Sequence, residues 1–574
     1  MKWMLMLKYD IILYMDCIRK TVFDAKLYLH IIKIEKQMLR KHAGQSGIPC
    51  SAYGSLERDA KPMTRGEMYM KKFVVAILAM AMLLVTMNSS LAYTYEEPVK
   101  SSKLPRSTPL EKGVNPSYLY DMLDQLEQAG IEMHSLLVSV DNEVIFEGFW
   151  DPYGPETPHI VHSLTKLFTN AAAGVAVTNG DLSLDDRLID MFPELAPENP
   201  SENLQKVTLR YLITMNGGYG RMISGSEWRP LKTSWLEAFF AEPVPYEPGT
   251  HYQYSSGNAY AVSAMVQKAT GKTCLDLLLE SGFSELGMEH FTWDLSPEGI
   301  CSGGNGVSCT TEDMLKVGNL FLNMGQWNGK QILTEEWCRM AIGLDKVYEG
   351  QGDYAFHWTD KHDGNYTSTG AYGQIVILVP ELNMVVAGTA GTTKTNEEYN
   401  IINSAMIAPA KADKAMQETV AAKEQTLNLL QNPILTDSPI AEKVDEKVFK
   451  AEENEDGITS IKLDVEKGYI DFIMVDQRGE HTIRNGIGEW MDGSTTMTGN
   501  YLHHQYQNEI EPYTAYGEWK DETTLQLTWR YPSMAFVDTV VITFSEDGSE
   551  MTMVRSVNVN SGALVRPAVT LKAE

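Results

Sequence analysis

The chain has 574 residues, of which 43% are hydrophobic and 22% charged, and its formal net charge at pH 7 is −28. This composition excludes collagenous, wholly disordered and polytopic membrane proteins, and the length predicts two or more domains. Because the charge is strongly negative, nucleic acid and anionic lipid surfaces are not expected as partners.

A secretory signal peptide is predicted at residues 70–92. A positively charged start at 70–72 precedes an apolar run at 73–87, and small residues follow up to Ala92. This order is typical of a cleaved signal, and the apolar run is shorter than a membrane span, although a retained amino-terminal anchor is the alternative. We therefore expect a secreted protein, extracellular or associated with the cell envelope, with no membrane span after cleavage.

Residues 1–69 precede the predicted signal peptide, which can act only at an amino terminus. They are rich in Met, Lys and Ile and show no sustained alternation of apolar and polar residues. We hypothesise that they are mistranslated upstream sequence, and no fold is predicted for them. Peptides from residues 1–60 in the native protein would refute this hypothesis.

Residues 98–412 combine strand and helix patterns and are predicted to form one domain. Alternating residues at 135–148, with turn residues at 141–142, predict a β-hairpin. Residues 164–177 carry apolar residues at helical spacing, and this pattern ends before Gly180. The domain is therefore expected to combine a sheet with helices.

Residues 413–440 are predicted to be a linker that contains a helix, because prolines near its end interrupt any longer element. Beyond it, residues 441–574 alternate between apolar and polar positions in short runs, for example at 461–465 and 525–531. Several short strands at regular spacing predict a small all-β domain, either a barrel or a sandwich.

The segment 162–166, His-Ser-Leu-Thr-Lys, places a serine and a lysine three residues apart at the start of the predicted helix. One helical turn brings Ser163 and Lys166 to the same face. A serine hydroxyl becomes a good nucleophile when a neighbour takes its proton, and a buried lysine can do so because desolvation favours its neutral form. Taken alone, this short pattern favours a capping serine followed by a solvent-facing lysine, so it needs support from other motifs.

Further segments resemble motifs of the β-lactamase and penicillin-binding-protein superfamily. Residues 247–260 resemble the Pro-Gly and Tyr-x-Asn region of class C β-lactamases and their esterase and peptidase relatives, with Tyr254 in place of the motif tyrosine. Residues 368–374, Ser-Thr-Gly-Ala-Tyr-Gly-Gln, resemble the Lys-Thr-Gly or His-Thr-Gly strand of that family. The resemblance covers about residues 105–410 in the family's order, with shorter matches at 182–186, 207–214 and 303–307.

The resemblance implies an α/β (α+β) transpeptidase-like domain, in which an antiparallel sheet is flanked by helices and joined by a helical subdomain. It also implies that Ser163 forms an acyl-enzyme, that Lys166 and Tyr254 share the proton transfers, and that the backbone N–H groups of Ser163 and Ala371 form the oxyanion hole. No cofactor and no metal are implied. The implied substrate-binding residues are Ser256, Asn258, Ser368, Thr369 and Gly370.

Two residues depart from the family's pattern. Ser256 stands where these relatives often have Asn, so the amide that helps to hold the lysine and the substrate is either missing or replaced by Asn258. Ser368 stands where many relatives have Lys or His, so a positive charge that could receive a substrate carboxylate is absent unless another cation substitutes. The sequence thus favours neutral esters or amides, as in the carboxylesterase and 6-aminohexanoate-dimer hydrolase branches.

Several functional questions stay open at this stage. A β-lactam, a D-alanyl peptide or another cell-wall-derived ester or amide is an alternative substrate, and a non-catalytic penicillin-binding-like sensing or binding protein is the alternative function. The oligomeric state and the role of the β domain are not predicted. His357 and Trp358 either line the pocket or form a packed strand edge.

Other candidate residues carry weaker signals. His503-His504 lack the companion ligands of a zinc motif and are expected to be an exposed pair on a strand rather than a metal site. The cysteines that remain after processing show no metal spacing, and no disulfide is required in a chain of this length. These cysteines are Cys274, Cys301, Cys309 and Cys338, of which Cys301 and Cys309 are the only close pair in the sequence.

Overall fold

The computed structural model describes residues 103–406 and 435–574, apart from residues 289, 498, 500, 507 and 508. The predicted signal peptide, the segment before it and the helix expected in the linker lie outside the described residues. No helix in the described ranges is both long enough and apolar enough to cross a membrane.

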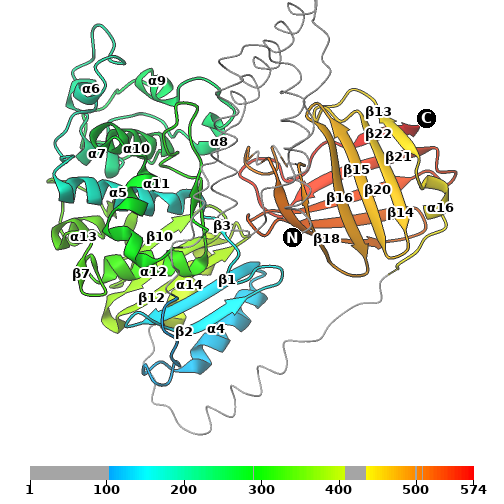
Figure 1. The fold of residues 1–574 in the computed structure, drawn as a ribbon, viewed down its shortest axis with the longest axis horizontal. Coiled ribbons are helices and arrows are strands. Elements are labelled where there is room, and N and C mark those ends of the chain that lie inside the picture. The colour runs from blue at the N-terminus through cyan, green and yellow to red at the C-terminus, as the bar shows by residue number, and fades with distance from the viewer. Residues whose placement is uncertain (1–102, 289, 407–434, 498, 500, 507–508) are drawn as a thin grey trace, which may run out of the picture. The chain divides into compact units, whose positions relative to one another are not determined.

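A seven-stranded antiparallel sheet organises residues 103–406, with the strand order β2-β1-β12-β11-β10-β9-β8 (Figure 1). The predicted hairpin is confirmed, because β1 and β2 pair antiparallel and both turn residues, Asp141 and Asn142, have the positive φ that tight hairpin turns require. The strands are β1 (Met133–Val140), β2 (Glu143–Phe149), β8 (Tyr354–Ala355), β9 (Trp358–Asp360), β10 (Tyr366–Gly370), β11 (Gln374–Val379) and β12 (Met384–Ala390).

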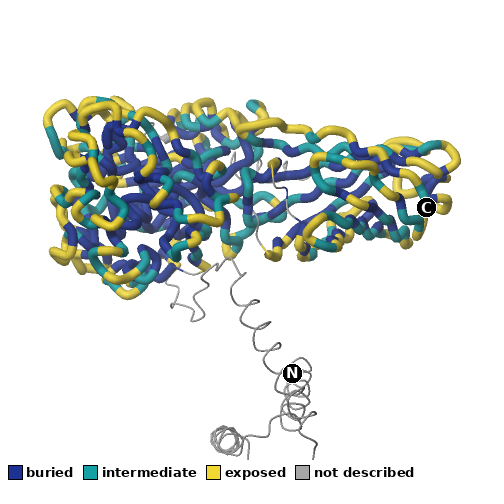
Figure 2. Tube along the Cα trace, turned by 90° about the horizontal axis from the view of Figure 1, so that it is seen from above, coloured by how far each residue is buried: buried dark blue, intermediate teal, exposed yellow. Residues whose placement is uncertain are grey.

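Helices cover both faces of this sheet. Leu136 belongs to a core cluster with α4 (Pro116–Gln128) and α14 (Thr395–Met406), whereas its neighbour Leu137 belongs to the larger cluster that contains α12 (Thr311–Leu322). Successive strand residues point to opposite faces, so each face of β1 is buried against a different set of helices. Exposed residues lie mainly on the outer loops (Figure 2).

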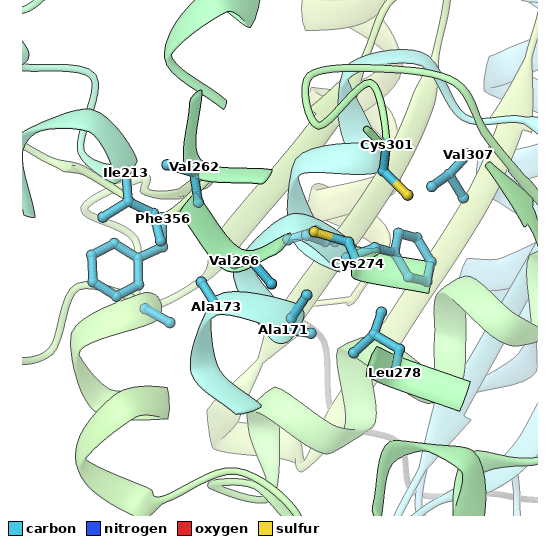
Figure 3. Close-up of a cluster of buried hydrophobic side chains, with 14 of the residues drawn as sticks. Ala171, Ala173, Ile213, Val262, Val266, Cys274, Leu278, Cys301, Val307 and Phe356 are labelled. Atoms are coloured by element: carbon cyan, nitrogen blue, oxygen red, sulfur yellow. The ribbon is translucent and has the colours of Figure 1, made fainter. Parts of the chain in front are cut away.

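The predicted helix is confirmed as α5 (Thr165–Asn179), which ends where Gly180 takes the left-handed conformation at φ 80°. Its small residues allow close packing: a Cβ added at Gly174 would lie 2.5 Å from Nε1 of Trp337. Figure 3 shows Ala171 and Ala173 of α5 among the buried side chains of the neighbouring helices. The helices and turns around α5 are η1 (His162–Leu164), α6 (Leu188–Met191), α7 (Leu209–Ile213), α8 (Gly225–Trp228), α9 (Trp235–Phe240), α10 (Ser256–Thr270), α11 (Cys274–Glu280) and α13 (Glu335–Ala341).

Residues 448–573 form a ten-stranded sheet that closes into a barrel through an additional pairing between β16 and β18. Burial alternates along its strands, as in β15 and β19, because inward side chains such as Phe472 and Trp529 fill the interior. The strands are β13 (Val448–Ala451), β14 (Ser460–Glu466), β15 (Tyr469–Asp476), β16 (Gly479–Ile487), β17 (Met491–Thr495), β18 (Glu511–Trp519), β19 (Thr524–Arg530), β20 (Val537–Phe544), β21 (Glu550–Val557) and β22 (Val569–Ala573).

The expected fold class is confirmed. The sheet with helices on both faces and the additional helical region match the transpeptidase-like architecture, and the carboxy-terminal strands form the barrel rather than the sandwich. A short helix, α16 (Ala441–Val444), leads into the barrel, and its Val444 is buried against the barrel core.

Candidate active site

Ser163 lies in the short turn η1, immediately before α5 begins at Thr165. Two hydrogen bonds hold this turn against the short strand β5 (Val307–Cys309): the Val161 N–H donates to the Val307 carbonyl at 2.9 Å, and the Val307 N–H donates to Oγ1 of Thr165 at 3.0 Å. His162, the residue before the serine, has a φ of +47°, which non-glycine residues rarely adopt. The backbone around Ser163 is therefore fixed by its surroundings rather than by local preference.

Lys166 lies in the first turn of α5 and is 3% exposed. Its amine donates to the carbonyl of Gly304 at 2.7 Å and to the hydroxyl of Ser256 at 3.4 Å. Burial lowers the pKa of Lys166 to about 7, because the charged form loses its hydration. A large fraction of the amine is then neutral near pH 7 and can accept a proton.

Tyr254 lies just before α10, and the Ser163 side chain beside its hydroxyl partly offsets the effect of burial on the pKa of the phenol. The Lys166 amine lies 4.8 Å from the centroid of the Tyr254 ring. Burial raises the pKa of Tyr254 to about 12, so the phenol keeps its proton at neutral pH. Ser255 fixes this segment by capping α10, because its hydroxyl accepts from the N–H groups of Gly257 and Ile223.

The structure thus brings together the three side chains expected to carry the chemistry. Ser163 and Lys166 come from η1 and α5, and Tyr254 comes from the segment that leads into α10. A serine hydroxyl beside a half-buried phenol and an amine of lowered pKa is an arrangement that can remove and return a proton.

Strand β10 carries the Ser-Thr-Gly motif of residues 368–370 and lies against η1. A Cβ added at Gly370 would lie 2.3 Å from the carbonyl oxygen of Val161, so only glycine allows this approach. Ala371 follows directly in the turn between β10 and β11, and its carbonyl accepts from the Gln374 side chain at 3.1 Å. The predicted oxyanion residues Ser163 and Ala371 therefore sit on two segments in direct contact.

The predicted substrate-binding residues differ in their surroundings. Ser256 contacts the Lys166 amine, whereas Asn258 is 1% exposed and neither polar atom of its side chain has a partner among the described residues. The structure thus gives the lysine contact to Ser256 and not to Asn258. On β10, Ser368 is 1% exposed and Thr369 is exposed, so Thr369 presents the more accessible hydroxyl.

His357 and Trp358, predicted either to line the pocket or to form a packed strand edge, occupy different surroundings. Trp358 is fully buried and its ring contacts Phe321 in the core. His357 instead lies at the site: its ring centroid is 6.4 Å from that of Tyr254, and its Nδ1 accepts from the Tyr354 hydroxyl at 3.1 Å. Sequence reasoning missed Tyr354, because no local pattern links it to the motif residues.

Residues from the barrel segment also reach the neighbourhood of the serine. The Tyr506 hydroxyl lies 3.4 Å from Nδ1 of His162, and the Arg229 guanidinium lies 3.6 Å from the centroid of the Tyr506 ring. Arg229 also donates to Oδ1 of Asn305 at 3.1 Å, next to the Gly304 carbonyl that holds Lys166. No sequence pattern indicates this contact, since 344 positions separate His162 from Tyr506.

The expectation of an exposed histidine pair on a strand is wrong. His503 lies in a turn, is 2% exposed, and places Nε2 2.7 Å from Oδ1 of the fully buried Asp538. The described ranges contain no group of three or more His, Cys, Asp or Glu that could hold a metal ion. The described cysteines are buried free thiols: Cys274, Cys301, Cys309 and Cys338.

A family model described as Beta-lactamase matches residues 122–409, which is half of the chain and includes Ser163, Lys166 and Tyr254. The chain therefore belongs to the β-lactamase family, and the resemblance of its motifs to this superfamily is confirmed.

Two curated relatives are hydrolases by name. The 6-aminohexanoate-dimer hydrolase of Paenarthrobacter ureafaciens is 25% identical over 311 residues, which cover 49% of this chain and 78% of that protein. The lovastatin esterase of Penicillium rubens is 30% identical over 148 residues, which cover 22% of this chain and only 37% of that protein. Family and relatives together identify the chain as a hydrolase of the β-lactamase family.

Among solved structures, an octameric penicillin-binding protein homologue from Pyrococcus abyssi aligns with a TM-score of 0.41 and 14% identity, covering 80% of this chain and 99% of that chain. A penicillin-binding protein from Bacillus halodurans aligns with a TM-score of 0.41 and 17% identity, covering 49% of this chain and 99% of that chain.

Proposed function

We propose that the protein is a secreted serine hydrolase that cleaves a neutral ester or amide through an acyl-enzyme on Ser163. The observation that carries the proposal is the position of Ser163 beside the phenol of Tyr254, whose ring centroid lies 4.8 Å from the amine of Lys166, a lysine with a pKa of about 7. This combination supplies a nucleophile, a proton acceptor and a proton donor in one place.

The reaction proceeds in two acyl transfers. Oγ of Ser163 attacks the substrate carbonyl carbon while its proton passes to the Lys166 amine, directly or through Tyr254. The N–H groups of Ser163 and Ala371 stabilise the oxyanion, which is worth about 3–4 kcal/mol per donor in comparable hydrolases. The carbonyl carbon's bond to the leaving group then breaks, and the leaving group takes a proton from Tyr254, which Lys166 replaces. Water attacks the acyl-enzyme with the same groups acting in reverse and releases the acid.

The preference for a neutral substrate rests on the motif position at Ser368. Its side chain is buried and uncharged where many family members carry a cation, so β10 offers no positive side chain at this position for a substrate carboxylate. The relatives named as a 6-aminohexanoate-dimer hydrolase and a lovastatin esterase favour the ester or amide branch over β-lactams. A small ester or amide derived from the cell wall is compatible with this preference if it is uncharged near the cleaved bond.

Secretion is part of the proposal and rests on the signal-like order of residues 70–92 and on the acidic composition. Amino-terminal sequencing of the native protein tests it. A start shortly after Ala92 in the culture medium or cell envelope is expected, whereas an intact segment 70–92 in the mature protein would contradict cleavage.

Labelling of the full chain by a fluorophosphonate and by a fluorescent penicillin tests the catalytic proposal. We expect label from the fluorophosphonate, none in Ser163→Ala, and full label in Ser404→Ala, a control at an exposed serine on α14. Strong labelling by the penicillin would contradict the neutral-substrate preference. No label from either reagent would favour a non-catalytic binding or sensing protein.

A further inference from the structure

The hairpin between β8 and β9 has an unusual turn. Its two central residues, Phe356 and His357, both have positive φ, 40° and 75°. Two-residue hairpin turns with this geometry normally use Asn-Gly or Gly-Gly, because larger side chains are strained in it. Here both residues are also buried, at 1% and 6% exposure, although turns ordinarily face solvent. Such strain persists where the surroundings over-determine the conformation, and it clusters at functional sites.

Two hydrogen bonds clamp this turn between the helix and the strand that carry the site. The Phe356 carbonyl accepts from Nδ2 of Asn170 at 2.9 Å, and Asn170 lies one helical turn after Lys166 on α5. On the other side, Nε2 of His357 lies 3.1 Å from the Thr369 carbonyl on β10. Trp337 fixes the orientation of Asn170, because its Nε1 donates to the Asn170 amide oxygen at 2.8 Å.

These contacts define one tautomer of His357. A carbonyl can only accept, so Nε2 carries the proton and donates to Thr369, which leaves Nδ1 to accept from the Tyr354 hydroxyl at 3.1 Å. Both nitrogens are therefore satisfied in the neutral ring. Burial and the neighbouring Lys166 lower the pKa of His357 well below its usual value, and the other titratable groups that face it are Tyr254 and Tyr354.

The cavity that these residues line is small. A cavity of about 10 Å³ lies among Lys166, Asn170, Tyr354, Phe356 and His357. A water molecule needs roughly 10–15 Å³ of such volume, so at most one water fits. His357 therefore acts on the site through the groups that it holds in place.

We propose that His357 is a positioning residue for the hydrolysis: its imidazole ties Tyr354 to the Thr369 carbonyl and so fixes the end of β10 against η1 and α5. The Thr369 carbonyl belongs to the same peptide unit as the Gly370 N–H, and Gly370 is the residue in close approach to Val161. Ala371, whose N–H is assigned to the oxyanion hole, comes one residue later. A shift of this peptide unit would misplace that donor. A displacement of about 1 Å can cost 10²-fold in rate.

Steady-state kinetics of the full chain with p-nitrophenyl acetate, normalised by active-site titration with a fluorophosphonate, tests the proposal. We expect His357→Phe, which fills the space but makes neither hydrogen bond, to lower kcat about tenfold or more with KM changed less than twofold. His357→Gln can still donate to the Thr369 carbonyl and should recover kcat to within about threefold of the wild type. A His357→Gln variant as slow as His357→Phe would overturn the proposal, as would a His357→Phe variant with full kcat.

A double-mutant cycle adds a readout that general loss of packing would not give. Because Tyr354 acts through His357, we expect the Tyr354→Phe substitution to lower kcat about threefold in the wild-type background. In the His357→Phe background the same substitution should change kcat less than 1.5-fold. Tyr252→Phe is the matched control, since the Tyr252 ring contacts Tyr354 at 5.6 Å between centroids and should act independently of His357. Effects of Tyr354→Phe and His357→Phe that multiply would overturn the proposal.

The inference rests on the proposed function, and the two can fail separately. A wild-type chain that takes no fluorophosphonate label contradicts the proposed function itself. A wild-type chain that is labelled and active, with His357 variants of normal kcat, contradicts the positioning role alone.

Discussion

The amine of Lys166 donates to the carbonyl of Gly304 at 2.7 Å, and that loop residue lies against the start of α10. A Cβ added at Gly304 would come within 2.6 Å of the Ser256 Cβ, so the glycine lets the carbonyl reach the buried amine. This contact holds Lys166 without placing a carboxylate beside it. The amine is therefore not kept charged by a counter-ion, and burial alone lowers its pKa.

The pH dependence of the reaction should follow Lys166. Because the neutral amine accepts the serine proton, kcat/KM is expected to rise with pH through about 7 and to level off above it. Tyr254, with a pKa of about 12, should add no alkaline decline below about pH 10. A pH–rate profile with a neutral ester checks this, and activity that falls as pH rises from 6 to 8 would contradict the assignment of Lys166 as the proton acceptor.

Lys166 should also make stability depend on pH. Its folded-state pKa of about 7 lies below the ordinary value of 10.5, so between these values the unfolded chain binds a proton that the folded chain lacks. The cost of burying the amine is therefore greatest below pH 7 and fades as pH rises toward 10.5. The difference in Tm between Lys166→Met and the wild type should shift in favour of the wild type from pH 7 to pH 10, and a constant difference would contradict the lowered pKa.

Loss of the Tyr254 hydroxyl should slow the reaction strongly. Tyr254→Phe keeps the ring beside Lys166 but removes the proton donor that contacts Ser163, so kcat is expected to fall about 10²–10⁴-fold. Tyr252→Phe, two residues earlier and half-exposed, serves as the control and should keep kcat within about threefold. Comparable losses in both variants would mean that Tyr254 has no special role.

The close approach of β10 to η1 should not tolerate a side chain. In Gly370→Ala the new methyl group would meet the Val161 carbonyl, which must push the strand away from Ser163. We expect at least a tenfold loss of kcat/KM and a lower Tm. Gly352→Ala is the matched control, because nothing lies within 4 Å of its added Cβ, and its stability should stay within about 0.5 kcal/mol. Equal behaviour of the two variants would argue against the contact.

The barrel segment should influence the serine through Tyr506. Tyr506→Ala removes the ring that lies under the Arg229 guanidinium and the hydroxyl near His162, so a several-fold lower kcat is expected. Tyr516→Ala, which removes a ring in contact with Trp490 within the barrel segment, should leave kcat unchanged. Identical kinetics of both variants would indicate that the barrel does not support the site.

The motifs could be located from sequence because their chemistry is local. Ser163 and Lys166 lie on one turn of a helix, and the hairpin and strand patterns follow periods of 3.6 and 2. The position of Tyr506 could not be predicted, because its contact with His162 spans 344 positions of the chain. For His357 the sequence left the pocket and the packed strand edge as alternatives, because its place depends on the turn between β8 and β9. The burial of His503 is not predictable from local pattern either, because its buried partner Asp538 lies 35 residues away on β20.

Peptide mapping of the chain after rapid quenching with a slowly hydrolysed neutral ester tests the central claim most directly. We predict that the acyl group is found on the peptide that contains Ser163 and that Ser163→Ala carries none. Turnover of the ester by Ser163→Ala at the wild-type rate, or an acyl group on a different residue, would contradict nucleophilic catalysis by Ser163.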